Sequence, residues 1–499
     1  MAKSPTLPDA LSAEARAFCE RGHGLLIGGE VVPAADGATF ATLDPATGSA
    51  IALVAQAGDA DVDAAVAAAR AAFAPDAPWR TMSAAARSAA IWRLADLLEQ
   101  HADELAQLES LDNGKPVKFA RFVDVASSVE QLRYFAGWPT KIEGATLPIA
   151  APNVHAYTRQ VPVGVCGQII PWNFPLLMAS WKIAPALAAG CTIVLKPAEQ
   201  TPLTALRLGE LALEAGIPPG VLNVLTGDGS TGAALVAHPD VDKIAFTGST
   251  AVGREIGAVA GRSLKRVTLE LGGKSPNIIL PDADIEAAVK GSFAGLYFNS
   301  GQACNAASRL MVPAPMLDEV VTALGQAADA AVTGPGLDRE TFIGPLVSAE
   351  QHERVSGFIA SGRGEAELVA GGQTALEGHE TGYFVKPTLF TTSDDDARIV
   401  REEIFGPVLV AQPYDDLEEV AARANAGEYG LAAGVWTRDV SSAHRLASLL
   451  RAGSVYVNCW SVGDPSAPFG GFKASGIGRE HGHEGLSAYL ETTSVFVQL

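Results

Sequence analysis

The sequence predicts an α/β protein with two α/β units and a small β arm, and three observations support this. Through the middle of the chain, short apolar strands alternate with helices, an order typical of parallel sheets built from βαβ units. A second alternating set runs from residues 277–280 to 453–459. Residues 142–162 and 487–499 fit neither set, because they have the pattern of extended arms without a core of their own.

The length of 499 residues agrees with several domains, since one ordinary hydrophobic core does not extend over so long a chain. The predicted division is a first domain at 1–139 and 163–273, a second at 274–482, and an arm at 140–162 and 483–499. The glycines of residues 272–274 are the expected hinge. In the first domain, strands are expected at 163–170, 192–195, 221–225, 243–246 and 267–271, and helices near 203–215, 232–238 and 252–260. Leucines 94, 97, 98, 105 and 108 predict one further helix.

Composition excludes several classes of function. Asp and Glu outnumber Lys and Arg by 56 to 36, the formal charge is −20, and no basic stripe is evident, so nucleic acid is not an expected partner. The first residues lack an apolar signal region, and no apolar run approaches the roughly 18 residues that span a bilayer. The five cysteines include no CxxC pair. This argues against a disulfide framework and against a metal site, and it fits a reducing cytoplasm.

Cys304 is the first candidate for chemistry. A lone cysteine is more often a buried, inert side chain. Here, however, the neighbours are small and polar, with Asn299, Gly301 and Gln302 just before the thiol. They predict a turn feeding a helix, where free backbone N–H groups stabilise a thiolate and a developing oxyanion.

Glu270 is the second candidate. Strand alternation places Val267, Leu269 and Leu271 on one face and Thr268 and Glu270 on the other. A carboxylate at this strand end, followed by two glycines, is either a solvated edge charge or a general base in a cleft at the carboxyl end of a sheet.

Nucleotide binding is indicated, but not in the standard register. Residues 226–232 contain a formal GxGxxG with Gly229 and Gly232, yet no acid stands about 20 residues later in FTGST (246–250). The better acidic candidate is Glu199, which follows the strand at 192–195. The EHGHE stretch at 480–484 is predicted to be a solvated turn rather than a metal cluster.

Eight short motifs occur in one order along the chain. They are PWNFP (171–175), KPAE (196–199), FTGST (246–250), ELGGKSP (270–276), GQAC (301–304), EIFGP (403–407), NC (458–459) and PFGG (468–471). Together they resemble the aldehyde dehydrogenase superfamily over about residues 25–499. The resemblance implies a Rossmann-like cofactor-binding first domain, a catalytic α/β second domain and an oligomerisation arm, in a homodimer or homotetramer.

The resemblance also implies catalytic roles. Cys304 resembles the nucleophile that forms a thiohemiacetal with the aldehyde, and Asn173 with the backbone N–H of Cys304 resembles the oxyanion hole. Glu270 resembles the base that activates water to hydrolyse the thioester, and Lys182 belongs to the same catalytic group.

The implied cofactor is NAD, and Lys196 beside Glu199 leaves NADP use open. Lys196 and Glu199 resemble the groups that bind the adenosine ribose. Ser249 and Trp172 resemble pyrophosphate contacts, and Glu403 and Phe405 resemble contacts to the nicotinamide ribose and ring. The remaining expected cofactor contacts are Ile169, Pro171, Gly229, Gly232, Phe246, Gly248, Val252, Leu271 and Gln351.

The expected aldehyde contacts are Phe174, Trp181, Phe298, Asn305, Trp460 and Phe469. Asn305 departs from the family by making the wall beside the nucleophile more polar, and Gly463 stands where relatives often carry a bulky residue. The large apolar faces of these contacts, with no Arg or Lys among the channel and mouth residues before Lys473, predict a bulky hydrophobic or aromatic aldehyde of the phenylacetaldehyde type.

Alternative functions remain open. Within the family, the substrate is alternatively a semialdehyde or an amino- or betaine-type aldehyde. An acylating enzyme that passes the thioester to coenzyme A does not need a water-activating Glu270, so the presence of Glu270 weighs against this alternative. A catalytically silent structural relative does not need Cys304, Glu270 and Asn173 together, so their joint presence weighs against that one.

Overall fold

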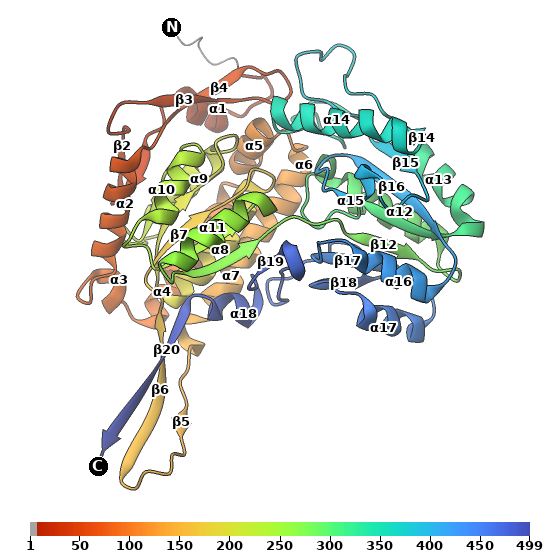
Figure 1. Ribbon diagram of the computed structural model, residues 1–499. Coiled ribbons are helices and arrows are strands. Elements are labelled where there is room, and N and C mark those ends of the chain that lie inside the picture. Colours follow the sequence, from red (N-terminus) through yellow and green to blue (C-terminus); the bar gives the residue numbers. More distant parts are fainter. Residues whose placement is uncertain (1–6) are drawn as a thin grey trace.

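The computed structural model describes residues 7–499 and shows two open sheets, each flanked by helices, and a slender arm that projects from the body (Figure 1). The first sheet has the strand order β19-β11-β10-β7-β8-β9-β1-β2. Strands β11, β10, β7, β8 and β9 are parallel, while β1, β2 and β19 pair antiparallel. The bounds are β1 Leu25–Ile27, β2 Glu30–Val32, β7 Val165–Ile169, β8 Thr192–Lys196, β9 Leu222–Val224, β10 Lys243–Thr247, β11 Arg266–Glu270 and β19 Gly476–Ile477.

The order of the strands reverses at β7. On one side of it the sheet continues with β8 and β9, and on the other side with β10 and β11. This is the Rossmann-like order, in which ligands bind outside the carboxyl ends of the strands where the order reverses. The five parallel strands begin within three residues of the predicted starts, at residues 165, 192, 222, 243 and 266. A small hairpin, β3 Thr39–Leu43 and β4 Ala50–Ala55, belongs to the same part of the chain. Its helices are α1 Ala13–Glu20, α2 Asp59–Ala72, α3 Pro78–Thr81, α4 Ala84–Gln100, α5 Ala102–Asn113, α6 Val117–Phe119, α7 Ala126–Ala136, α8 Pro175–Ala189, α9 Leu203–Glu214, α10 Gly229–Ala237 and α11 Thr250–Arg262.

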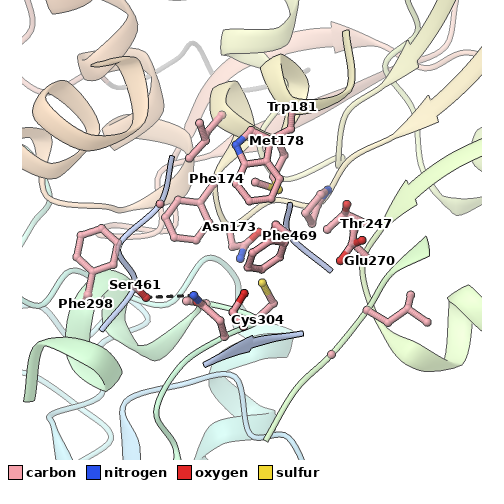
Figure 2. A pocket seen from close by; sticks show the side chains of 18 of the residues that line it. Asn173, Phe174, Met178, Trp181, Thr247, Glu270, Phe298, Cys304, Ser461 and Phe469 are labelled. Atoms are coloured by element: carbon pink, nitrogen blue, oxygen red, sulfur yellow. Dashed lines mark hydrogen bonds between the residues drawn. The ribbon is translucent and has the colours of Figure 1, made fainter. Parts of the chain in front are cut away.

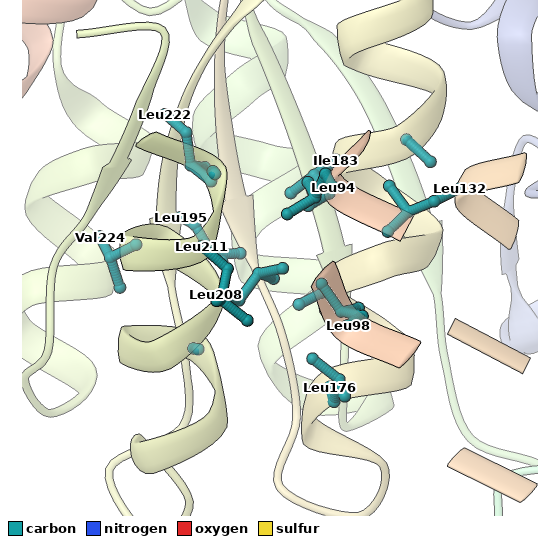
Figure 3. Close-up of a cluster of buried hydrophobic side chains, with 14 of the residues drawn as sticks. Leu94, Leu98, Leu132, Leu176, Ile183, Leu195, Leu208, Leu211, Leu222 and Val224 are labelled. Atoms are coloured by element: carbon teal, nitrogen blue, oxygen red, sulfur yellow. The ribbon is translucent and has the colours of Figure 1, made fainter. Parts of the chain in front are cut away.

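The leucines expected in a single helix lie in two. α4 ends at Gln100 and α5 starts at Ala102, because His101 (φ −96°, ψ 18°) leaves the helical conformation between them. Both helices still bury their leucines in one core with α7, α8 and α9 and the sheet, as Figure 3 shows for Leu94, Leu98 and Leu132. The α8 helix is buried along most of its length, so its ends are held firmly.

The second sheet has the order β14-β15-β16-β13-β12-β17-β18, parallel except for the β14–β15 pair. Its elements are β12 Pro276–Ile279, α12 Ile285–Tyr297, β13 Arg309–Pro313, α13 Leu317–Ala330, α14 Ala349–Glu365, β14 Glu367–Ala370, β15 Thr388–Thr391, α15 Arg398–Arg401, β16 Val408–Tyr414, α16 Leu417–Ala426, β17 Ala432–Trp436, α17 Val440–Leu449 and β18 Ser454–Val457. Residues 271–275 connect the two sheets, so Glu270 and Cys304 come from opposite sides of this connection.

The arm is a three-stranded antiparallel sheet of order β20-β6-β5, with β5 Thr146–Leu147, β6 Val154–Pro162 and β20 Leu490–Gln498. The short helix α18, Gly482–Ser487, leads into β20. Phe496 and Leu499 are strongly exposed on the arm, and β20 has a free edge. The two segments expected to be extended therefore pair with each other.

Candidate active site

A cavity of about 1090 Å³ lies at the carboxyl ends of the strands of the first sheet and is lined by residues of both sheets. Its lining includes the three residues predicted for the central chemistry, Asn173, Glu270 and Cys304. Figure 2 shows these three side chains directed toward one space, with Phe174, Trp181 and Phe469 around it. The topology brings them together from the loop after β7, the last residue of β11 and the turn after α12.

Cys304 lies in an irregular turn between α12 and β13. Asn299 (φ 51°), Ser300 (φ 55°) and Gly301 (φ 71°) are three successive left-handed residues, which costs energy at the first two. The prediction of a turn feeding a helix is therefore wrong. The turn follows the end of α12, and the next regular element after Cys304 is the strand β13. The backbone N–H groups of Cys304 and Asn305 still stabilise the thiolate, while burial, Glu270 and Glu403 raise the pKa of the thiol to about 12.

Asn173 is buried in the loop between β7 and α8. Its Nδ2 donates to the carbonyl of Gln302 at 2.9 Å, and the Nδ2 of Asn299 donates to the carbonyl of Asn173 at 2.9 Å. These reciprocal bonds join the Asn173 loop to the Cys304 turn. An amide nitrogen carries two N–H groups, so Asn173 retains one donor for a negative oxygen beside Cys304.

Glu270 ends β11 and is 4% exposed, which excludes the solvated edge charge. As predicted, Leu269 and Leu271 pack in the apolar cluster on the other face of the strand. Burial is the main cause that raises the pKa of Glu270 well above its ordinary value; the charge of Glu480 adds to it, and Lys182 and Arg479 oppose it. Both carboxylate oxygens are buried without a hydrogen-bond partner among the described residues.

Lys182, predicted to be catalytic, does not line the cavity. Its Nζ donates to Oε1 of Glu480 at 2.5 Å, and both side chains are buried. The prediction of a solvated turn at 480–484 is thus wrong for Glu480 and His481, because Trp181 covers His481 at 4.0 Å between ring centroids and Lys182 binds Glu480. Burial lowers the pKa of His481 to about 4, so its ring is neutral at pH 7. Within residues 7–499, no group of three or more His, Cys, Asp or Glu side chains has the arrangement of a metal site.

The predicted cofactor residues divide into two groups. The first group lines the cavity and consists of Pro171, Trp172, Gly248, Ser249, Leu271, Gln351, Glu403 and Phe405. The second group lies outside the lining and consists of Ile169, Lys196, Glu199, Gly229, Gly232, Phe246 and Val252. The second group lies in β7, β8 and β10, in the loop after β8, and in α10 and α11. Lys196 Nζ lies 3.4 Å from Oε2 of Glu199, so the two predicted ribose contacts form one pair.

Glu403 is held at the cavity wall by the backbone. Its Oε1 accepts a hydrogen bond from the N–H of Gly273 at 2.9 Å, and burial raises its pKa to about 7. Phe405 (φ 61°) is strained and meets Trp172 edge to face at 5.2 Å between centroids. Gln351 fixes this loop, because its Nε2 donates to the carbonyl of Phe405 at 2.7 Å.

The other end of the cavity is aromatic. All the predicted aldehyde contacts line it, namely Phe174, Trp181, Phe298, Asn305, Trp460 and Phe469. Phe174 stacks with Phe298 at 6.1 Å, and Trp181 meets Phe469 at 5.2 Å between centroids. The amide of Asn305 is not left unpaired, because its Nδ2 donates to Oγ of Ser461 at 3.1 Å.

Sequence reasoning missed one wall of this channel. Ser127, Glu130 and Gln131 of α7 line it together with Val123, which lies in the π-helical turn Ala120–Val125 just before α7. Their spacing places them on one helical face, but such a face equally suits an ordinary core contact, so no local signal distinguishes it. Met178, Val462, Asp464 and His481 were also missed.

Comparison with known proteins decides the family. The family model described as "Aldehyde dehydrogenase family" matches residues 31–495. The chain belongs to this family. A phenylacetaldehyde dehydrogenase of Pseudomonas fluorescens is 50% identical over 483 residues, which cover 95% of this chain and 96% of the relative.

Solved structures agree with this assignment. A Bacillus cereus aldehyde dehydrogenase in complex with NAD+ is 52% identical, with a TM-score of 0.96 over 98% of this chain and 99% of that one. An indole-3-acetaldehyde dehydrogenase of P. syringae, in complex with NAD+ and IAA, is 43% identical, with a TM-score of 0.93 over 96% and 97% of the two chains. The predictions of an α/β aldehyde dehydrogenase and of a Rossmann-like cofactor fold are confirmed. None of the helices in residues 7–499 is long and apolar enough to cross a membrane.

Proposed function

We propose that this aldehyde dehydrogenase oxidises bulky apolar aldehydes, aromatic ones first, to carboxylic acids with NAD, through a thioester on Cys304. The observation that carries this proposal is one cavity with Cys304, Asn173 and Glu270 on its inner wall. Its aromatic end is lined by Phe174, Trp181, Phe298, Trp460 and Phe469. The inner wall supplies a nucleophile, an oxyanion donor and a base. The aromatic walls suit a substrate whose apolar body is far larger than two carbons.

The residues beside the reacting groups fit NAD. Ser249 caps α11 with a neutral hydroxyl, which accepts from the N–H of Val252 at 3.3 Å, whereas the carboxylate of Asp228 caps α10. The α11 N-terminus therefore keeps more of its attraction for a pyrophosphate than the α10 N-terminus does. At Gly248, any Cβ would lie 2.5 Å from Cζ of Phe246, so the packing of this ring against the backbone requires glycine there. When bound, NAD supplies the hydride acceptor.

Cys304 begins the reaction by attack of its sulfur on the aldehyde carbon. Because the pKa of the thiol is raised to about 12, its proton must be removed during the attack, and Glu270 is the carboxyl group that lines the same inner wall. The carbonyl oxygen becomes negative, and the free N–H of Asn173 and the N–H of Cys304 stabilise it. Loss of hydride from the carbon then leaves a thioester on Cys304.

Glu270 completes the reaction. Once the proton taken from the thiol has passed to solvent, Glu270 is a carboxylate again. It then takes a proton from a water molecule, the resulting hydroxide adds to the thioester carbon, and the carbon–sulfur bond breaks. The acid leaves, and Cys304 regains a proton. The unpartnered oxygens of Glu270 support this role, since they have capacity to accept from water. Glu270 also disfavours the coenzyme A-acylating alternative, which does not require activated water.

The charges of the channel mouth bear on the substrate class. Glu130 and Asp464 line the cavity at exposed positions, and none of the Lys and Arg side chains within residues 7–499 lines the aromatic end. A carboxylate-bearing semialdehyde would therefore meet like charge. An amino- or betaine-type aldehyde stays as the second candidate, because its cation would meet both these carboxylates and the aromatic faces.

A panel of aldehydes tests the proposal. We expect kcat/KM for phenylacetaldehyde and a C8–C10 aldehyde to exceed that for acetaldehyde and succinic semialdehyde by at least about tenfold, equivalent to about 1.4 kcal/mol of transition-state binding. Equal or higher efficiency with acetaldehyde or the semialdehyde would contradict the apolar assignment. A highest value with betaine aldehyde would favour the second candidate.

The proposal includes a homodimer or homotetramer assembled through the arm, and the domain division of residues 1–139 and 163–273, 274–482, and 140–162 with 483–499. The free edge of β20 and its exposed Phe496, Val497 and Leu499 support a protein contact there. Light scattering at micromolar concentration is expected to show an oligomer. A monomer would contradict this part of the proposal.

A further inference from the structure

A buried cluster of ionisable side chains, which the chemistry above does not use, lies against the Phe174 wall of the cavity. It consists of Glu109, Lys115 and Asp124, whose side chains are fully buried. Lys115 Nζ lies 3.5 Å from Oε1 of Glu109 and donates a hydrogen bond to Oδ2 of Asp124. Three ionisable groups without contact to water are costly to place in a core, so their position calls for a physical reason.

The cluster contacts the aldehyde channel through Phe174. Lys115 Nζ lies 4.0 Å from the centroid of the Phe174 ring, a cation–π contact within a region shielded from water. The same ring stacks with Phe298 and lines the cavity. Phe174 is thus an aromatic wall of the channel with a buried ammonium against it.

Glu109 supports the start of α8. The N-cap residue is Phe174, which has no side-chain acceptor, and Pro175 has no N–H to donate. The first free N–H of the helix is that of Leu176, and Oε2 of Glu109 accepts it at 3.1 Å. A side chain 67 residues away in sequence therefore performs the capping that the local sequence lacks.

Asn113 adds a third contact to the same loop. Its Nδ2 donates to the carbonyl of Trp172 at 2.6 Å, and its Oδ1 accepts from the N–H of Lys115 at 3.2 Å. Trp172, Phe174 and Leu176 are thus all held by residues 109–115. Asn173, the proposed oxyanion donor, lies between the first two of these held positions.

The same segment also contacts the side of the molecule that carries the nucleophile. Gly114 (φ 86°) ends α5, and the backbone of Gly344 approaches the carbonyl of Gly114 so closely that a Cβ at position 344 would collide with it. The carbonyl of Gly344 accepts from Oγ of Ser300 at 2.8 Å, and Ser300 belongs to the turn before Cys304. Residues 109–115 therefore contact the Asn173 loop directly and the turn before Cys304 through Gly344.

We propose that Lys115 is a positioning residue for this enzyme: by binding Glu109 and Asp124 beneath Phe174, it sets the loop of Asn173 relative to the turn of Cys304. It acts through these residues and does not touch the substrate. The inference rests on the proposed roles of Asn173 and Cys304, and it assigns a function to a cluster that lies outside the cavity.

Lys115→Met tests the inference, because it keeps most of the length of the side chain and removes the charge. We expect kcat with the aldehyde that the panel ranks first to fall about 10- to 100-fold, as small misplacements of reacting groups do, while the Kd for NAD, measured by protein fluorescence, stays within about twofold. Lys118→Met is the matched control: Lys118 is on the same segment, and its Nζ donates to the carbonyl of Arg339 away from the cluster. It should retain wild-type kcat.

A double variant separates positioning from general damage. If Lys115 acts through Asn173, then Lys115→Met/Asn173→Ala should be no more than about threefold slower than Asn173→Ala, because both changes affect stabilisation of the same oxygen. Losses that multiply would overturn the inference.

A second variant covers the case in which Lys115→Met leaves two unpaired carboxyl groups and does not fold. The triple change K115M/E109Q/D124N neutralises the cluster and keeps its shape, which is expected to preserve the fold. A folded triple variant with a 10- to 100-fold lower kcat supports the inference. A folded variant within threefold of wild type, or an unfolded one, overturns it, since the charges then serve only the fold.

Two reference variants keep this failure distinct from failure of the proposed function. If Cys304→Ala and Asn173→Ala retain wild-type turnover, the proposed chemistry is wrong. If both are impaired and the cluster variants are not, only the role of Lys115 is wrong.

Discussion

The two ends of the active-site cavity are built in opposite ways. At the inner end, Asn173 and Glu270 are 3% and 4% exposed, and the loop that carries Asn173 is held from several sides. At the mouth, Val462 is 66% exposed, and a Cβ at Gly463 would have no neighbour within 4 Å. Burial fixes the geometry and protonation of the inner groups, on which the chemistry depends. The open mouth leaves the shape of the substrate to side chains that can change without disturbing the fold.

The largest expected effect is at the inner end. Cys304→Ala should abolish dehydrogenase and esterase activity, since covalent catalysis has no substitute thiol in the turn, while NAD binding stays unchanged. Cys459→Ala is the matched control, because its free thiol is partly buried nearby but does not line the cavity. Steady-state turnover measures both. Retention of more than a few per cent of activity by Cys304→Ala would show that another group is the nucleophile.

The next effect concerns the pH dependence that burial imposes on Glu270. The base is the carboxylate, and burial raises its pKa well above the ordinary value, so activity should rise with pH through that raised pKa and be low below it. Glu270→Gln should lose about 100-fold or more in kcat, because the attack and the hydrolysis both use this base. Whatever thioester still forms should accumulate as an acyl-enzyme, which mass spectrometry detects.

Glu480→Gln sharpens the same point. Removal of the like charge of Glu480 should lower the pKa of Glu270 and shift the rising part of the pH–rate profile to lower pH. An unchanged profile would mean that another group limits the rate.

A smaller effect is expected at the ribose site, where Glu199 is half-exposed. NAD should be preferred over NADP by at least about tenfold in kcat/KM, because a 2′-phosphate would meet the carboxylate. Lys196 moderates the repulsion. Glu199→Gln should reduce the preference by raising efficiency with NADP. Equal use of both cofactors by the wild type would contradict the assignment.

The smallest effect is expected at the mouth. Gly463→Trp should lower kcat/KM for phenylacetaldehyde about three- to tenfold and leave acetaldehyde within about twofold, because the indole would narrow the channel and not the inner end. Gly427→Trp is the control, since Gly427 is equally free of neighbours but lies outside the cavity lining. Equal losses with both aldehydes would show that the two ends are not independent.

The sequence alone was enough to identify features that depend on neighbouring residues. Strand alternation placed Glu270 on the face opposite Leu269 and Leu271, and the polar turn around Cys304 marked this thiol as a candidate nucleophile in the cavity wall. The resemblance in eight motifs indicated the family, and the strand starts of the first sheet were close to those observed. Period and turn chemistry are local properties, so they can be recognised before the chain is folded.

Only the tertiary structure decided the partners of the charged residues. Lys182 and Glu480 are 298 residues apart in sequence, and Glu109 caps a helix that begins 66 positions later. Whether a charge is solvated or paired depends on which distant element is folded against it, and no spacing along the chain records that. The same reason explains why the turn at 480–484 was predicted to be solvated, and why Lys115 gave no signal before the fold placed it beneath Phe174.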